Sequence, residues 1–431
     1  MKKIYFVLMG LSFFLCGCLP RGGEKIVNYE NGLKSVLISD QNSLAASAYV
    51  FIRAGAIDEK PSQAGLSHFL EHLMFKGSVN YPGDAFSRNV ENMGGYINAM
   101  TSNEYTAYYI NVSRDGIEKA VEMLADTVQN PLFPQNEIDK ERKVVIEEIQ
   151  RHSDNPIAVL DEQFMKDIYP TSALKNSVIG TSNVIANVTR DEIYGYYASH
   201  YVPEKMVVAV CGNFDEKKIN ALIGETFGKF VKKTPPQNPK VIEETHEAKN
   251  TVKNGKVEIG YLFSGFLGPV ISDDDIFTAD LAGTILGGGK SSRLYRVLKE
   301  EKQLVFSIGS SFFATTGNGV LYISAVFDPQ NLESVKNEIK AQIEKIISDG
   351  VSAEELKRAK VSVKTGWSFS FEKPSDIAYS YGYWHLMKRP EAVKEYIKKI
   401  EKITVKDIQK FFEKYYSQDK IINTALLPEV S

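Results

Sequence analysis

The chain has 431 residues, of which 43% are hydrophobic and 24% charged. This composition is that of a globular protein, and the length is too great for one ordinary domain, so we expect two to four. The 51 basic and 54 acidic residues are interspersed and leave a net charge of −3. No basic footprint of a nucleic-acid-binding protein stands out.

A short targeting segment opens the sequence. Two lysines precede an apolar run, Ile4 to Cys16, that is too short to span a bilayer. It leads into Leu15-Cys16-Gly17-Cys18, which resembles the lipobox of bacterial lipoproteins. The resemblance implies a signal peptide over residues 1–17, a lipidated Cys18 and a tether over residues 18–26. An ordinary secretory signal and a simple apolar anchor are the alternatives.

By this interpretation the mature protein is an exported bacterial lipoprotein, anchored to a membrane and facing the periplasm. Leu19 stands after Cys18 in place of the Asp that retains some lipoproteins in the inner membrane, which favours the outer membrane. Cys211 would be the only thiol left, so no disulfide framework is possible. It ends the apolar run Met206 to Cys211 and is expected in a buried strand.

The first half of the chain alternates strand and helix patterns. Short apolar runs predict strands, and apolar residues at helical spacing predict helices. The expected strands are residues 34–39, 45–53 and the segment 96–112, and the expected helices are residues 65–76, 84–93, 117–128 and 134–151.

The helix over residues 65–76 carries His68-x-x-Glu71-His72. Histidines four residues apart project from one face of a helix and can hold a zinc ion together with a third ligand. Glu71 lies one turn from His68 and can reach a water molecule without binding the metal. The order His-x-x-Glu-His is that of the inverzincins.

Two further carboxylates lie on the long helix over residues 134–151. Glu141 and Glu148 are seven residues apart and share one helix face. If both carboxylates face the protein interior, they need a cation or hydrogen-bond donors as partners, and a bound metal is such a partner. Turned outward, they would belong to a charged solvent face, and the periodicity leaves both alternatives open.

The second half of the chain repeats the first. Residues 188–201 resemble residues 403–416 at an offset of 215, with Thr189 and Thr404 at equivalent N-cap positions. A Pro-bearing charged segment separates the halves. We therefore expect an α+β fold with an N-terminal domain over residues 27–235, a linker over 236–254 and a C-terminal domain over 255–431 without a metal motif.

Five segments together resemble the M16 metallopeptidases, the pitrilysin and insulinase family, and within it the M16B branch that includes the mitochondrial processing peptidase β subunit. They are residues 31–34, 53–59, 65–77, 93–99 and 141–148. The resemblance implies two homologous domains, each an antiparallel-rich sheet flanked by helices, in a clam-like arrangement.

The resemblance also assigns roles to individual residues. It implies one Zn²⁺ per chain, with His68, His72 and Glu148 as ligands and Glu71 as the general base. Glu141 matches a supporting glutamate. Glu147 is the nearest alternative to Glu148, but it points about 100° away on a helix.

Substrate-binding residues follow from the same comparison. Asn98 and Ala99 match the strand edge with which family members pair an extended peptide. Many members carry an Arg and a Tyr in the second domain that hold the substrate at the zinc; Lys299 and Phe306 stand at these places. Lys lacks the guanidinium fork and Phe lacks the hydroxyl.

This departure has two explanations. A second M16 subunit supplies the Arg and Tyr in a heterodimer, which is the interpretation we favour, or a homodimer carries out relaxed chemistry with Lys299 and Phe306. The function expected is that of a zinc-dependent endopeptidase acting on extended peptides or unfolded protein segments. A non-catalytic or partner-dependent scaffold subunit is the alternative.

Overall fold

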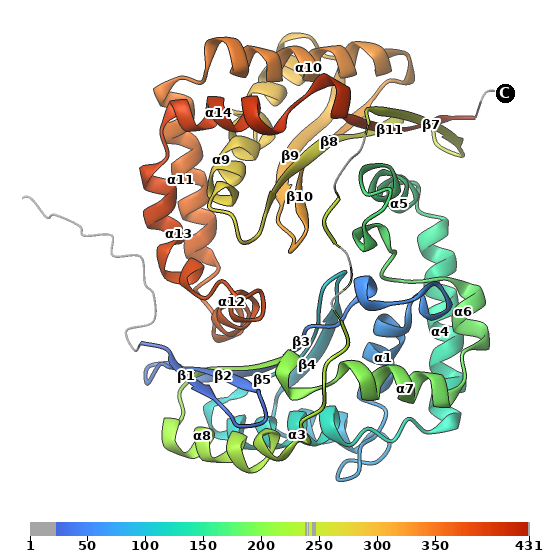
Figure 1. Ribbon diagram of the computed structural model, residues 1–431, viewed down its shortest axis with the longest axis vertical. Coiled ribbons are helices and arrows are strands. Elements are labelled where there is room, and N and C mark those ends of the chain that lie inside the picture. The colour runs from blue at the N-terminus through green and yellow to red at the C-terminus, as the bar shows by residue number, and fades with distance from the viewer. Residues whose placement is uncertain (1–22, 238, 240, 244–246, 430–431) are drawn as a thin grey trace, which may run out of the picture.

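The computed structural model describes residues 23–237, 239, 241–243 and 247–429, and it contains two α+β units that face each other (Figure 1). Cys18 and the lipobox lie outside the described residues. The first unit contains β1 (Lys25–Asn28), β2 (Lys34–Ser39), β3 (Ala45–Ile52), α1 (Leu66–Met74), α2 (Ala85–Asn92), β4 (Tyr96–Thr101), β5 (Thr106–Ser113), α3 (Ile117–Gln129), α4 (Gln135–Ser153), α5 (Pro156–Ile168), α6 (Ser182–Asn187), α7 (Arg190–His200), β6 (Met206–Gly212) and α8 (Glu216–Glu225).

The second unit repeats the order of elements that the first unit shows from β2 to β6, with a π-helical segment in the place of α2. It contains β7 (Lys249–Gly255), β8 (Gly260–Val270), α9 (Asp275–Gly287), a π-helical segment (Tyr295–Glu301), β9 (Val305–Phe313), β10 (Asn318–Phe327), α10 (Leu332–Asp349), α11 (Ala353–Phe369), α12 (Pro374–Leu386), α13 (Glu391–Lys402), α14 (Val405–Tyr415) and β11 (Ile422–Pro428).

The two sheets share one topology apart from the additional edge strand β1 of the first. The first has the order β1-β2-β6-β3-β5-β4 and the second the order β7-β11-β8-β10-β9. In each sheet one pair is parallel, β2 with β6 and β7 with β11, and the other pairs are antiparallel. This confirms the predicted fold of two similar, antiparallel-rich α+β units.

The sequence repeat corresponds to equivalent helices. Thr189 accepts a hydrogen bond from the backbone N–H of Glu192 at the start of α7, and Thr404 accepts one from Asp407 at the start of α14. Both complete a capping box, because the acidic side chain bonds back to the N-cap backbone. Each helix leads into the strand next to the sheet centre, β6 or β11.

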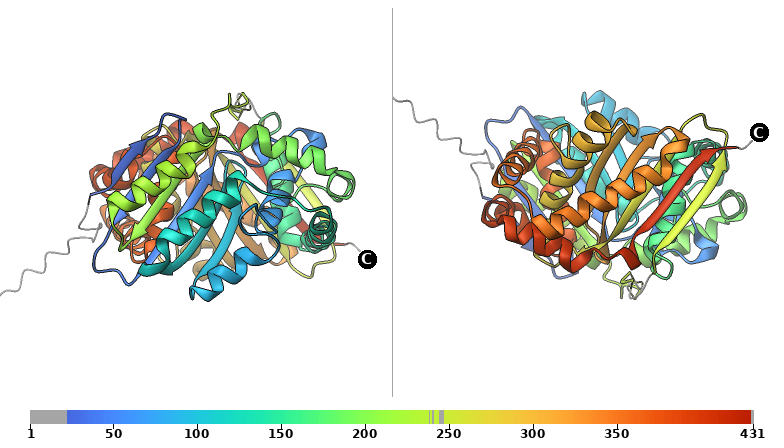
Figure 2. Two further views of the ribbon diagram at one scale, coloured as in Figure 1. Left: turned by 90° about the horizontal axis from the view of Figure 1, so that it is seen from below. Right: turned by 90° about the horizontal axis from the view of Figure 1, so that it is seen from above.

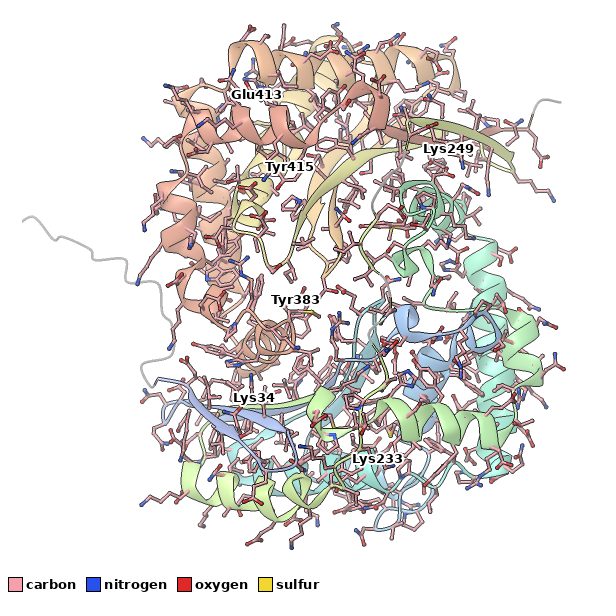
Figure 3. The ribbon with its side chains drawn as sticks, in the orientation of Figure 1. Lys34, Lys233, Lys249, Tyr383, Glu413 and Tyr415 are labelled. Carbon is pink, nitrogen blue, oxygen red and sulfur yellow. The ribbon has the colours of Figure 1, made fainter. Side chains whose placement is uncertain are left out.

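Each unit contributes a helix to the other unit's sheet. Helix α12 packs on β3 and β6, and α5 packs on β8 and β11. Asp167 of α5 pairs with Lys249 of β7 at 2.7 Å and accepts a hydrogen bond from Thr424 of β11 at 3.0 Å (Lys249 is labelled in Figure 3). The packing of α5 and α12 on the opposite sheets joins the two units. The sequence repeat did not predict this packing.

The covering of both sheet faces explains the burial of the central strands. Helices of its own unit cover one face of each sheet, as the views from below and above show (Figure 2), while α12 or α5 covers part of the other. All seven residues of β6 are buried, including Cys211, as its unbroken apolar run predicted.

Several expected boundaries differ in the structure. Residues 249–254, expected in the linker, form most of β7, because their backbone pairs in parallel with β11. The strand β1 begins at Lys25, inside the expected tether. The segment 96–112 is a hairpin of β4 and β5. Within the described residues, every helix is too short or too polar to cross a bilayer.

Candidate metal centre

The buried side chain of Glu59 holds the N-terminus of helix α1 in place. Gly65 adopts a left-handed conformation with φ of 95° and offers no capping side chain. Instead the Glu59 carboxylate accepts hydrogen bonds of 2.7 Å from the backbone N–H groups of Gly65 and Ser67. The first N–H groups of a helix have no hydrogen-bond acceptor within the helix. Glu59, which precedes the helix by several residues, supplies the acceptors and so caps it.

Two more contacts hold this end of the helix. Gly65 packs so closely on Gly180 that a Cβ on Gly180 would lie 2.3 Å from the Gly65 Cα. The Ser67 hydroxyl lies 2.8 Å from that of Tyr196 on α7. Because Ser67 precedes His68, these contacts restrict where the first histidine of the motif can lie.

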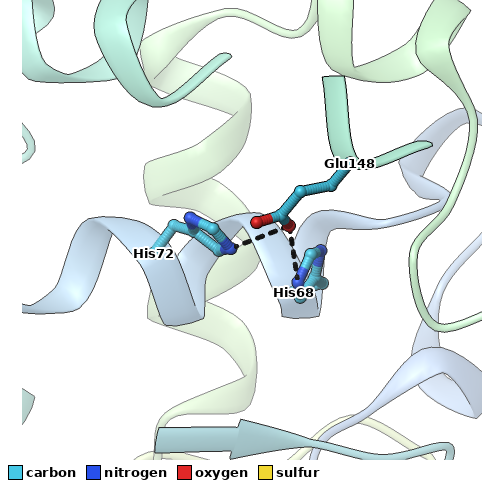
Figure 4. Close-up of side chains that lie close together, drawn as sticks. All are labelled: His68, His72 and Glu148. Atoms are coloured by element: carbon cyan, nitrogen blue, oxygen red, sulfur yellow. Dashed lines mark ion pairs between the residues drawn. The ribbon is translucent and has the colours of Figure 1, made fainter. Parts of the chain in front are cut away.

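The structure brings His68, His72 and Glu148 together (Figure 4). One carboxylate oxygen of Glu148 lies 3.4 Å from Nε2 of His72 and 3.7 Å from Nε2 of His68. The three ligand atoms lie within 4.8 Å of one another. Helices α1 and α4, which carry them, pack against each other.

This donor set fits zinc. Tetrahedral zinc at about 2.0–2.2 Å from nitrogen and oxygen ligands requires separations of roughly 3.3–3.6 Å between them. The two distances from Glu148 are close to that range. Among the described residues this is the only cluster of three or more His, Cys, Asp or Glu side chains with metal-binding geometry.

The environment keeps His68 uncharged. Burial lowers the pKa of His68 to about 4, and the neighbouring His72 adds to the effect. Its Nδ1 is buried and has no hydrogen-bond partner. A neutral imidazole is the form that binds a metal, so at neutral pH the ring needs no proton loss before coordination.

Glu71 faces the cluster from the same helix. Its carboxylate accepts a 2.6 Å hydrogen bond from the Thr101 hydroxyl of β4. Burial raises its pKa, although the Thr101 bond and His72 oppose this. Glu71 borders two cavities, one of about 700 Å³ that also adjoins His72 and one of about 450 Å³ that also adjoins His68.

Glu141 lies behind the second histidine. Its carboxylate is 3.1 Å from Nδ1 of His72 and 2.7 Å from Nζ of Lys76. Burial acts to raise its pKa, but the hydrogen bonds from Lys76 and His72 outweigh it, so the pKa is lowered. A charged Glu141 orients the imidazole and leaves Nε2 as its metal-binding atom. Glu147 is exposed.

The predicted substrate-binding strand is the free edge of the first sheet. Strand β4 pairs only with β5, so one row of its backbone groups has no partner strand. The Asn98 side-chain oxygen accepts a 2.9 Å hydrogen bond from the backbone N–H of Ala99. Both residues line the larger cavity beside Glu71.

Lys299 and Phe306 lie in the second unit and contact each other. Lys299 Nζ donates a 2.6 Å hydrogen bond to the backbone oxygen of Phe306, whose side chain is 56% exposed. Within the chain that the structure describes, neither residue lines a cavity beside Glu71. The structure therefore does not bring this pair into the metal cluster.

Among the described residues of the second unit, no cluster of metal-ligating side chains lies at the equivalent place. Helices α9 and α11 pack together as α1 and α4 do. Thr284 and Gly288 of α9 and Glu355, Arg358 and Ser362 of α11 line a cavity of only about 60 Å³ there. The Glu355 carboxylate pairs with Arg293 at 2.6 Å, and no imidazole lines the cavity, so these residues do not supply the set of ligands that zinc requires.

Known protein families match both halves of this arrangement. Residues 34–182, which carry the three residues of the cluster and Glu71, match the family model described as Insulinase (Peptidase family M16). Residues 187–363 match the model described as Peptidase M16 inactive domain. The chain belongs to peptidase family M16. The inactive-domain model covers α9 and most of α11, where the second unit lacks metal ligands.

Relatives named as zinc proteases resemble the chain over most of its length. An uncharacterized zinc protease of Bacillus subtilis strain 168 is 27% identical over 394 residues, which cover 90% of this chain and 95% of the relative. An uncharacterized zinc protease of Rickettsia felis is 29% identical over 381 residues, which cover 87% and 92%.

Solved structures agree with the fold. A protease from Helicobacter pylori, 25% identical, has a TM-score of 0.89 and covers 94% of this chain and 99% of its own. A structure described as a peptidase M16 inactive domain from Pseudomonas fluorescens, 17% identical, has a TM-score of 0.87 with coverage of 95% and 99%. The second likeness concerns the fold alone.

Three residues of the site were not predicted from the sequence. Glu59 caps helix α1, Thr101 binds Glu71, and Lys76 binds Glu141. Glu59 and Lys76 stand within the segments that resemble M16, but only their contacts reveal these roles. Thr101 could have been suspected because it follows Asn98 and Ala99 on the same strand.

Proposed function

We propose that this M16 protein is a zinc-dependent endopeptidase that hydrolyses extended peptides or unfolded protein segments. The observation that carries the proposal is the joining of His68, His72 and Glu148 in zinc-binding geometry, with Glu71 beside them at an open strand edge. The zinc proteases among its relatives support the choice of metal.

Different residues of the chain would hold the metal and transfer the proton during peptide hydrolysis. His68, His72 and Glu148 would hold the zinc, which when bound supplies a Lewis acid that lowers the pKa of water and polarises a carbonyl oxygen. Glu71 accepts a proton from the attacking water and passes it to the nitrogen of the leaving amine. Burial raises the pKa of Glu71 and so helps it to keep that proton between the two steps.

Thr101 and Glu141 act through other residues. The Thr101 hydroxyl bonds one oxygen of Glu71, which restricts the carboxylate and leaves its second oxygen for the proton. Glu141 holds His72 through Nδ1. Both contacts reduce the reorientation that would otherwise precede the reaction.

The free edge of β4 supports extended substrates. A peptide strand that adds to β4 gains main-chain hydrogen bonds independent of its sequence, and it passes the cavities on both sides of Glu71. A folded protein does not offer such a strand, because its backbone groups are already paired. Unfolded segments therefore suit this site.

The scaffold alternative is not favoured, because the chain keeps all of His68, Glu71, His72 and Glu148. The heterodimer remains a proposal: a second M16 subunit would supply an Arg and a Tyr where this chain has Lys299 and Phe306. We also keep the proposal of an exported lipoprotein acylated at Cys18, which mass spectrometry of the mature N-terminus tests.

The deciding experiment measures metal content and hydrolysis together. The purified chain is expected to hold one zinc and to cleave an unfolded polypeptide; Glu71→Gln should keep the zinc and lose at least about 100-fold in rate. Glu91→Gln, at an exposed position on α2, serves as control. Near-normal hydrolysis by Glu71→Gln would overturn the proposed mechanism. Zinc without hydrolysis in the wild-type chain would favour the missing subunit.

A further inference from the structure

The two faces of β4 offer different surfaces. Ile97 and Ala99 pack on the core beneath α1, on the side of the metal cluster. Met100 packs with the residues between the first sheet and α12, on the opposite side. Since side chains alternate along a strand, Tyr96 and Asn98 face this opposite side. Tyr96 is 56% exposed there.

The Tyr96 ring is held in place by its neighbours. Its centroid lies 6.3 Å from that of Tyr109 in an edge-on arrangement, and Tyr109 stacks on Tyr49 at 4.4 Å. Asn98 Nδ2 donates a 3.0 Å hydrogen bond to the Tyr96 hydroxyl. An aromatic side chain that is both exposed and braced loses little conformational freedom when it binds a partner.

A peptide strand on β4 would meet this ring. Alternate residues of an added strand project to each face, and directly opposite side chains have Cβ atoms about 4.5–5.5 Å apart. Thr101, which binds Glu71, lies five residues after Tyr96, so the ring is roughly 17 Å along the strand from the catalytic carboxylate. The peptide residue that contacts the Tyr96 ring would therefore lie about three to five residues from the scissile bond.

We propose that Tyr96, braced by Tyr109 and Asn98, is a specificity residue that favours substrates with an aromatic or large aliphatic side chain opposite it. This inference rests on the proposed peptidase function and adds a substrate class to it. The favoured side chain lies on the face of the substrate strand that points away from the metal. It would pack edge-on or offset against the Tyr96 ring.

The test scans one Phe through a Ser- and Gly-rich peptide with a single cleavage site, using the zinc-loaded full chain. Phe is expected to raise kcat/KM about threefold to tenfold at one position three to five residues from the cut, and not at the adjacent positions. Tyr96→Ser should bring the ratio of Phe to Ser peptide to about one, while Tyr96→Phe should keep it. Tyr194→Ser, at another exposed tyrosine on α7, should keep the wild-type ratio.

Binding separates this inference from the peptidase proposal. The same peptides are titrated against the full chain by fluorescence anisotropy. If nothing is hydrolysed but the Phe peptide binds better in a Tyr96-dependent way, only the peptidase proposal fails. Equal binding and equal hydrolysis of Phe and Ser peptides, or a preference that survives in Tyr96→Ser, would overturn the role of Tyr96.

Discussion

Replacing Glu59 by Ala should loosen the start of α1, the helix that carries His68 and His72. The Glu59 side chain is 8% exposed and is the hydrogen-bond acceptor for the backbone N–H groups of Gly65 and Ser67. Ala removes both acceptors and leaves the two donors at a site with little access to water. Each unsatisfied buried donor costs about 1–3 kcal/mol, so the local stability should fall by about 2–6 kcal/mol.

Hydrogen–deuterium exchange measures this loss at the helix itself. A fall of 2 kcal/mol raises the exchange rate of the Gly65 and Ser67 amides about thirtyfold, and larger losses raise it further. Zinc affinity should fall as well, because His68 follows Ser67 directly. In Glu91→Ala, on the exposed side of α2, exchange in α1 should stay as in the wild type. Unchanged exchange at Gly65 and Ser67 in Glu59→Ala would refute the capping role.

The protonation of Glu59 gives a second readout. Burial raises its pKa to about 8 from the ordinary 4.5, against the opposing pull of the Ser67 and Gly65 hydrogen bonds. The folded chain therefore holds this proton more tightly than the unfolded chain. Its contribution to stability is present below pH 4.5 and is lost as the pH rises to about 8. Glu59→Gln should remove that part of the pH dependence of unfolding, and an unchanged slope would contradict it.

Two more predictions concern the histidines. Glu141→Gln should weaken zinc binding about 10-fold to 100-fold in a chelator competition, because His72 loses its charged partner, and an unchanged affinity would show that Glu141 does not support the ligand. Burial lowers the pKa of His68 to about 4 from 6.5, so the unfolded chain binds this proton more readily. The zinc-free protein should lose stability as the pH falls from 6.5 towards 4, and urea unfolding should find this slope reduced in His68→Asn but kept in His152→Asn.

The His-x-x-Glu-His motif could be predicted from the sequence because the helical repeat fixes which residues share a face. His68, Glu71 and His72 lie within five consecutive residues, so their common face follows from the helical repeat alone. The same holds for the N-caps at Thr189 and Thr404 and for the buried run that ends at Cys211. Each of these depends on contacts within a few residues or on unbroken apolar character.

Other features depended on distant contacts. The periodicity of residues 134–151 did not decide whether Glu141 and Glu148 face inward; the packing of α4 on α1 puts them at the histidines. The polar and charged composition of residues 249–254 indicated a linker, yet pairing with β11 makes them a strand. Backbone hydrogen bonds need no particular side chain, so composition could not reveal that pairing.

By itself the sequence determined the helix that carries the His-x-x-Glu-His motif, the duplication of an α+β unit and the absence of the motif from its second copy. Only the tertiary structure decided how the site is held: by Glu59 beneath α1, Thr101 on Glu71, and Glu141 between His72 and Lys76. It also placed α5 and α12 on each other's sheets. The physical reason is that a helical or strand repeat fixes only the geometry of residues that are close in the chain. The burial of a carboxylate and the position of a covering helix depend on residues that are distant in sequence and pack against them.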